Sequence, residues 1–244
     1  MSDVAYNLNQ VQERVAEAAL GAGRQPAEVT LVAVTKTRPP EAVVDAYQAG
    51  VRHFGENRVE EGMPKIPVVH AAISGPQPVW HMVGHVQSRK AEDVAGHFDY
   101  VHSVDRLKIA RRLSRFTGEA GRQLRVLLEC NVSGEESKYG FDLRDWAQDA
   151  DRREAFFAAV DEILALPGLV VQGLMTMAPF VADPETVRPV FASLRVLLAA
   201  LRERFPAHEW RHLSMGMTDD FEVAIEEGAT MVRIGRAIFG PRSY

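Results

Sequence analysis

Cysteine is almost absent from this sequence of 244 residues, which contains only Cys130. A single thiol cannot close a disulfide within the chain. This excludes the small secreted folds that depend on disulfide frameworks, and it suits a reducing compartment. Cys130 lies in an apolar run over residues 124–132. We therefore expect a buried thiol in the protein core.

Long apolar segments and targeting signals are also missing. The sequence has no uninterrupted run of about 18 apolar residues, which a membrane-spanning helix would need. Residues 1–10 have neither the basic start nor the apolar centre of a signal peptide. These two absences predict a cytoplasmic protein that does not associate with membranes.

An excess of positive charge is absent as well. The formal net charge of −5 and the isoelectric point of about 5.9 argue against a nucleic-acid-binding surface. Gly21 and Gly23 follow a predicted helix instead of a strand, so they do not form a dinucleotide-binding loop. His81 and His85 are four residues apart, but they straddle a strand end and no glutamate follows His81. We therefore predict no metal site.

What the sequence does contain is a regular alternation of short apolar runs and segments of helical period, which is typical of βα units around a parallel sheet. Eight such units in 244 residues predict one domain, residues 1–244, folded as a single TIM (β/α)8 barrel of the α/β class. A doubly wound sheet would give a similar alternation and stays open at this point. The expected strands are residues 30–36, 53–56, 79–84, 98–103, 124–132, 169–175, 211–214 and 230–234.

The segments between the strands predict helices, with one exception. An amphipathic helix opens the chain, and its apolar face carries Leu8, Val11, Val15, Ala18 and Ala19. Residues 64–78 contain four prolines and one glycine and are predicted as a loop. Further helices are expected from residue 40, over 57–65, 87–95, 105–116, 152–165, 184–205 and 219–227, and near residue 236.

Lys36 is the residue with the strongest functional signal. It ends the first predicted strand, and period-two alternation places it on the same face as Val32 and Val34. Branched aliphatic residues fill barrel interiors, so Lys36 is expected to point inward at the rim where barrel enzymes hold their sites. A buried amine is either paired or has a lowered pKa that makes it a nucleophile. The alternative is a lysine just beyond the strand that extends into water.

Small and polar residues also end the last two predicted strands. Ser214 and Gly216 lie at the end of the seventh strand, and Arg233, Gly235 and Arg236 lie at the end of the eighth. Barrel phosphate sites are commonly built from these two loops and the N-terminus of a short helix. A phosphate site opposite a buried lysine is what pyridoxal 5′-phosphate (PLP) needs, because its aldehyde forms an imine with lysine. The alternative is that both glycines only make turns.

Distinctive motifs are spread along residues 31–240. They are Val32-Ala33-Val34-Thr35-Lys36, His53-Phe54-Gly55-Glu56-Asn57-Arg58, Trp80-His81 with Gly84 and Gln87, His102-Ser103-Val104-Asp105-Arg106, Asn131-Val132-Ser133-Gly134-Glu135 with Lys138 and Gly140, Gly173-Leu174-Met175-Thr176-Met177, Leu213-Ser214-Met215-Gly216-Met217 with Asp219-Asp220-Phe221, and Val232-Arg233-Ile234-Gly235 with Phe239-Gly240. In these motifs the chain resembles the YggS/PROSC family of PLP-binding proteins, from about residue 31 to residue 240. Two departures from the family pattern lie after the third strand, where Arg89 stands in place of an expected asparagine and His85 in place of an apolar residue.

The resemblance implies an alanine-racemase-type barrel that binds PLP as a Schiff base on Lys36. It also implies that Arg233 faces the pyridine nitrogen and that Ser214 and Gly235 hold the phosphate. The remaining pocket residues that it implies are Asn57, His81, Met175 and Thr176. Lys138, in the loop after the fifth strand, is a candidate for a second PLP attachment point; the alternative is a solvated lysine.

The role that the resemblance implies is PLP homeostasis: holding PLP as a carrier or buffer, and handing it to PLP-dependent apo-enzymes, without catalytic turnover. We expect a monomer. A PLP-dependent amino-acid racemase is the main alternative, and an aldolase-like barrel that uses Lys36 without PLP is another. Racemisation needs an acid/base group on each face of the cofactor, and alanine racemases supply a tyrosine for the second face. None of the tyrosines suits that role well, and Tyr139 is the least unsuitable.

Overall fold

The structure is a computed structural model that describes residues 3–241. Eight parallel strands close into a barrel in the order β4-β3-β2-β1-β9-β8-β7-β5, and the pairing of β4 with β5 completes the circle. The predicted TIM barrel is therefore confirmed, and the doubly wound sheet is excluded. The barrel strands are β1 (Thr30–Val34), β2 (His53–Glu56), β3 (Val79–Met82), β4 (Tyr100–Val104), β5 (Leu124–Asn131), β7 (Leu169–Met175), β8 (His212–Ser214) and β9 (Met231–Ile234).

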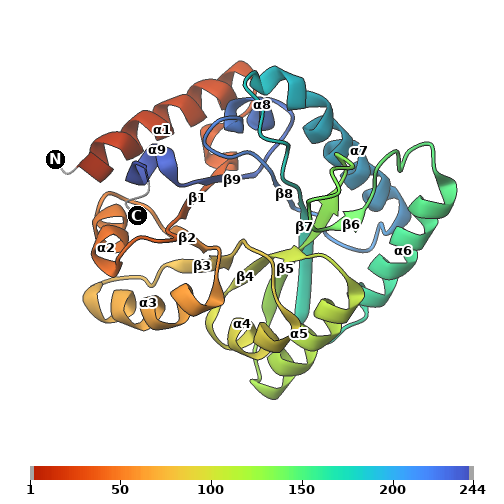
Figure 1. Cartoon of the computed structure of the whole chain (residues 1–244), viewed down its shortest axis with the longest axis horizontal. Coiled ribbons are helices and arrows are strands. Elements are labelled where there is room, and N and C mark those ends of the chain that lie inside the picture. The colour runs from red at the N-terminus through yellow and green to blue at the C-terminus, as the bar shows by residue number, and fades with distance from the viewer. Residues whose placement is uncertain (1–2, 242–244) are drawn as a thin grey trace.

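A ring of helices surrounds the barrel, and Figure 1 shows them following the strands in chain order around it. No helix within residues 3–241 is both long enough and apolar enough to cross a membrane. The helices are α1 (Asp3–Gly21), α2 (Pro40–Gln48), α3 (Val59–Ala72), α4 (Ala91–His97), α5 (Leu107–Glu119), α6 (Ala150–Leu164), α7 (Arg188–Arg204), α8 (Phe221–Glu226) and α9 (Arg236–Phe239).

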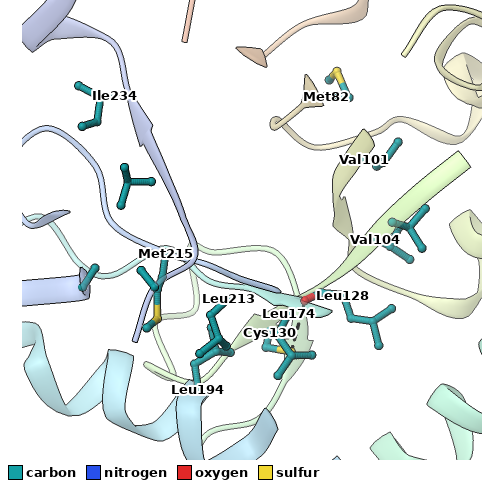
Figure 2. Packing of buried hydrophobic residues seen from close by; sticks show 14 of the residues in the cluster. Met82, Val101, Val104, Leu128, Cys130, Leu174, Leu194, Leu213, Met215 and Ile234 are labelled. Carbon is teal, nitrogen blue, oxygen red and sulfur yellow. Dashed lines mark hydrogen bonds between the residues drawn. The ribbon is translucent and has the colours of Figure 1, made fainter. Parts of the chain in front are cut away.

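Most of the apolar core lies between the strands and this helical ring. In β5, Leu128 and Cys130 point outward into it together with Val104 of β4 and Leu174 of β7 (Figure 2). The apolar face predicted for α1 is buried as expected. Cys130 is also buried, which confirms the core thiol.

The interior of the barrel has a different composition. Alternation along the strands directs Tyr100, Leu127, Met175 and Met231 inward, where they form a small separate apolar cluster. Much of the remaining interior is polar, and it includes two histidines and an arginine that are almost completely buried. Buried polar groups require hydrogen-bond partners, so this interior must hold an ordered network.

Two local predictions were wrong. The loop expected over residues 64–78 is largely helical, because α3 continues to Ala72 with Pro64 and Pro67 inside it. Proline removes backbone hydrogen bonds, but burial of Lys65, Ile66 and Val69 stabilises the helix beyond them. A two-residue strand that was not predicted, β6 (Phe141–Asp142), pairs with the end of β5.

Candidate functional site

A cavity of about 200 Å³ opens at the carboxyl ends of the strands. Lys36, Asn57, Arg233 and Gly235 line it together, so four of the eight predicted site residues share one cavity. The loops after β1, β2, β3, β7, β8 and β9 contribute to its wall. The other lining residues, which are not among the eight predicted site residues, are Val34, Arg38, Val83, Met177, Phe180, Met217, Thr218, Asp219 and Arg236.

Lys36 lies two residues beyond the end of β1 and is half-buried. The chain on both sides of it is held by carboxylates. The Thr35 hydroxyl donates to Glu56 Oε1 at 2.6 Å, and the Thr37 backbone N–H donates to Glu61 Oε2 at 2.8 Å. Thr37 has a φ of 63°, an uncommon conformation for a residue with a side chain. These contacts fix the backbone that presents Lys36 to the cavity.

A buried ion pair supports this part of the rim. Lys65 Nζ lies 2.6 Å from Glu56 Oε1 and donates to the Thr35 carbonyl at 2.8 Å. Burial raises the pKa of the Glu56 carboxyl, and the neighbouring Lys65 ammonium and the Thr35 hydroxyl oppose that rise. Breaking such a pair leaves a charge inside the protein, so the pair constrains where β2 and α3 meet.

Arg233 forms the floor of the cavity and is almost completely buried. Its Nη1 donates to Ser214 Oγ at 2.5 Å, and its Nη2 donates to the Thr176 carbonyl at 2.9 Å. Desolvation lowers the pKa of Arg233 to about 10, although the carboxylates of Asp220 and Glu129 act against it. The guanidinium is therefore a fixed cation at neutral pH.

Tight loops after β8 and β9 form one side of the cavity. Gly216 has a φ of 94°, and a Cβ there would lie 2.7 Å from Ala224 Cβ, so only glycine fits. The Asp220 carboxylate accepts the Met217 backbone N–H at 2.6 Å, which orders this loop. A Cβ on Gly235 would lie 3.1 Å from the Val34 carbonyl, so the chain passes close to β1 at this position.

Comparison with known proteins identifies the family. Residues 4–243 match the family described as alanine racemase, N-terminal domain. The pyridoxal phosphate homeostasis protein of Escherichia coli (strain K12) is 44% identical over 248 residues, which cover 100% of this chain and 99% of that protein. The protein of the same name from Pseudomonas aeruginosa is 43% identical over 244 residues, covering 100% and 98%. The chain belongs to the pyridoxal phosphate homeostasis protein family.

Solved structures agree with this assignment. PipY of Synechococcus elongatus PCC7942, in a structure with PLP bound, superimposes with a TM-score of 0.81 at 34% identity, covering 97% of this chain and 100% of that one. An alanine racemase of Clostridium difficile has a TM-score of 0.72 at 15% identity, covering 98% of this chain and 59% of that one. The second likeness shows a shared barrel fold.

The other four predicted site residues do not line the cavity. Ser214 and His81 are enclosed in the barrel interior, below Arg233. Thr176 contributes its carbonyl to Arg233, while its hydroxyl donates to the Cys130 carbonyl at 2.7 Å. Met175 belongs to the interior apolar cluster. Ser214 and Thr176 therefore hold the Arg233 guanidinium in place.

Glu129 is a buried group that the sequence analysis missed. It lies on β5, and its Oε2 has no hydrogen-bond partner among the described residues. Burial raises the pKa of its carboxyl to about 7, and the charge of Asp105 adds to the rise, while Arg233 and Arg106 oppose it. Alternation could have identified it, because Leu127 and Glu129 share the inward face of β5.

A second cavity of about 550 Å³ lies beside the first and shares Asn57 with it. Two of its lining residues, His85 and Tyr139, stack with ring centroids 3.9 Å apart. Arg89 donates to the Gln87 side chain at 3.2 Å. The two departures from the family pattern, His85 and Arg89, therefore lie at or near this neighbouring hollow.

Lys138 is close to the Lys36 cavity but is occupied by other contacts. Its Nζ donates to the Met177 carbonyl at 2.9 Å and forms an ion pair with Glu135 at 2.9 Å. Met177 itself lines the cavity. Among residues 3–241, no three or more His, Cys, Asp or Glu side chains are grouped as metal ligands.

Proposed function

We propose that this protein binds PLP as a Schiff base on Lys36 and takes part in PLP homeostasis as a carrier or buffer. The observation that supports this most strongly is the cavity in which Lys36 lies together with the buried cation of Arg233 and the close backbone of Gly235. Full-length relatives are named for PLP homeostasis, and the PipY structure contains PLP.

The residues present fit the chemistry of this cofactor. PLP supplies an aldehyde for a lysine amine and an electron-withdrawing ring. In our proposal, Lys36 provides the amine and Arg233 faces the ring nitrogen. Gly235 and Thr218, which line the cavity, would hold the phosphate together with the first backbone N–H groups of α9, which lack helical partners. Ser214 acts on this site through Arg233.

We propose further that the protein has no enzymatic turnover. Arg233 is a fixed cation, and a cation next to the ring nitrogen disfavours the protonated ring that a stable carbanion needs. Among residues 3–241, no tyrosine lines the Lys36 cavity. A racemase is the alternative, and Tyr139 in the adjacent cavity is its nearest candidate acid. Loss of the α-proton of L-alanine in heavy water, at roughly one per second or faster, would favour the racemase.

The proposed physiological role is to hold PLP and pass it to PLP-dependent apo-enzymes. We propose that the protein does so as a cytoplasmic monomer. Transfer requires reversible attachment, which imine chemistry provides. An apo-enzyme mixed with the PLP-loaded protein should gain activity faster than the same apo-enzyme mixed with free PLP. In this control, free PLP is given at the concentration that the loaded protein releases by itself.

Borohydride reduction tests the central proposal. The protein loaded with PLP should be yellow, should lose that colour on reduction, and should carry a phosphopyridoxyl group on Lys36 by peptide mapping. Lys36→Ala should abolish this adduct, whereas Lys90→Ala, at the edge of the neighbouring cavity, should keep it. A colourless protein, or an adduct confined to other lysines, would exclude Lys36 as the attachment point and would leave the aldolase-like alternative in place.

The position of the phosphate has a separate test. Gly235→Val places a branched side chain against the Val34 carbonyl and the cavity wall. It should weaken PLP binding at least tenfold more than it weakens pyridoxal, which lacks the phosphate. An equal loss for the two ligands would place the phosphate elsewhere.

A further inference from the structure

A continuous line of hydrogen bonds runs through the barrel interior below the cavity. His53 Nδ1 lies 3.0 Å from His81 Nε2, and His81 Nδ1 lies 2.8 Å from His102 Nε2. His102 Nδ1 lies 2.9 Å from Ser214 Oγ, which accepts from Arg233 Nη1 at 2.5 Å. Five side chains from β2, β3, β4, β8 and β9 are thus joined in one line.

The arginine at one end fixes the direction of the first bond in this line. A guanidinium can only donate, so Ser214 Oγ accepts from Arg233, and its own hydrogen is available for His102 Nδ1. A neutral imidazole that accepts at one nitrogen donates from the other. When Ser214 donates to His102, His102 donates from Nε2 to His81 Nδ1, and His81 donates from Nε2 to His53 Nδ1.

The environment of the line keeps its histidines uncharged. His81 and His102 have no exposed surface. Burial lowers the pKa of each well below the usual histidine range, and the cation of Arg233 lowers the pKa of His102 further. Tyr100 stacks on His81 with ring centroids 4.6 Å apart and restricts its rotation. The interior therefore favours a line of neutral imidazoles.

The far end of the line reaches the opposite face of the barrel. His53 is half-buried and lines a cavity of about 410 Å³ with Thr30 and Leu31, at the amino ends of the strands. The last donor, His53 Nε2, can therefore be satisfied near solvent without any charge inside the barrel. The charged and titratable groups near His53 are Arg125, Asp99, His81, His102 and His212.

We propose that His102, His81 and His53 are positioning residues that orient the Arg233 guanidinium through the Ser214 hydroxyl. With His102 in place, the hydroxyl hydrogen points to His102 and a lone pair points to Arg233 Nη1. Without that acceptor, the hydroxyl turns toward another group and its lone pair turns away from Nη1. The inference rests on the proposed function in one respect, which is that Arg233 faces the ring nitrogen of PLP.

Substitutions at position 102 separate this role from simple packing. Leucine and asparagine have nearly the same shape, but only asparagine has a carbonyl oxygen that can accept the Ser214 hydroxyl hydrogen near the position of Nδ1. In the PLP-loaded protein, His102→Leu should move the acid transition of the bound chromophore upward by about one pH unit, a tenfold change in proton affinity. The reason is that a less constrained Arg233 repels a ring proton less. His102→Asn should leave the transition near its wild-type value.

A histidine outside the barrel provides the control. His70 on α3 accepts a hydrogen bond from Trp80 Nε1 at 2.9 Å, and Trp80 belongs to the main apolar core outside the barrel. His70→Leu should lower stability without moving the chromophore transition. If His70→Leu moves the transition as much as His102→Leu does, or if the leucine and asparagine variants at position 102 titrate alike, the proposed relay is refuted.

The protein without cofactor gives an independent test. With nitrogen-15 in its histidine side chains, NMR near neutral pH should report the Nε2–H tautomer for His53, His81 and His102. An Nδ1–H tautomer at His102 would reverse the line and overturn the proposal, whether or not any variant folds. Failure to label Lys36 with PLP would instead refute the proposed function and would leave the tautomer result standing.

Discussion

Replacing Glu129 by glutamine should change how the stability of this protein depends on pH. The Glu129 carboxyl is 2% exposed, and its pKa is raised to about 7 from the ordinary 4.5. The folded protein therefore holds this proton more tightly than the unfolded chain does. Stability is lost as pH rises from about 4.5 through about 7, where the carboxyl must ionise inside the barrel.

The size of the effect follows from the shift. At about 1.4 kcal/mol per pKa unit, a shift from 4.5 to about 7 corresponds to about 3 kcal/mol when the carboxyl is fully ionised. Glu129→Gln cannot ionise. Its stability relative to wild type should therefore rise by about 2–3 kcal/mol between about pH 5 and pH 8. In a chain of this length, that corresponds to a relative gain of about 5–10 °C in melting temperature.

Urea unfolding followed by tryptophan fluorescence, at several pH values between about 5 and 8, measures this difference. The matched control is Glu17→Gln, because Glu17 is exposed on α1 and should change the pH profile little. If the free-energy difference between Glu129→Gln and wild type is the same at both ends of the pH range, Glu129 ionises normally. The account of this buried carboxyl would then be wrong.

Three further substitutions test other parts of the site. Lys65→Met should destabilise the protein by about 3–5 kcal/mol in urea unfolding, because Glu56 is left buried without its cation. The double variant with Glu56→Gln should recover much of that loss. Gly216→Ala should lower stability by at least about 1 kcal/mol, since φ is 94° and the new Cβ meets the backbone of α8. In Lys36→Ala protein given excess PLP and borohydride, Lys138 should be labelled much more slowly than Lys36 is in wild type. The reason is that a carboxylate and a carbonyl hold its ammonium; equal rates would contradict these contacts.

The barrel could be predicted from sequence because its signals are local. Each buried parallel strand is a short apolar run, and each run is followed by a segment of helical period, so strand and helix can be assigned residue by residue. The same reasoning placed Lys36, Arg233 and Gly235 at one rim, because the carboxyl ends of all strands meet there. Local signals failed at Pro64 and Pro67, where tertiary packing of α3 outweighs the helix-breaking tendency of proline.

The interior network could not be predicted in the same way. The stagger between neighbouring strands decides which inward side chains meet. The residue pattern of a single strand does not reveal that stagger. Ser214 is an example: the register that pairs it with Met231 brings its hydroxyl within hydrogen-bond distance of Arg233 and His102. Alternation places Glu129 on the inward face of β5, but one acidic residue in an apolar run does not reveal which charges it will face.

The single thiol of Cys130 can be used to measure local opening of the protein core. The side chain is buried on the outward face of β5 (Figure 2), and burial, with the charge of Glu129 adding to it, raises its pKa well above the ordinary value. Alkylating reagents react with the thiolate, so the closed molecule should resist them. Labelling of Cys130 then requires β5 to separate from the helices that cover it. The rate of labelling therefore reports how often this opening occurs in the absence of denaturant. The same strand also carries Glu129. If a bound ligand slows the labelling of Cys130, the decrease in rate measures how much the ligand stabilises the closed barrel.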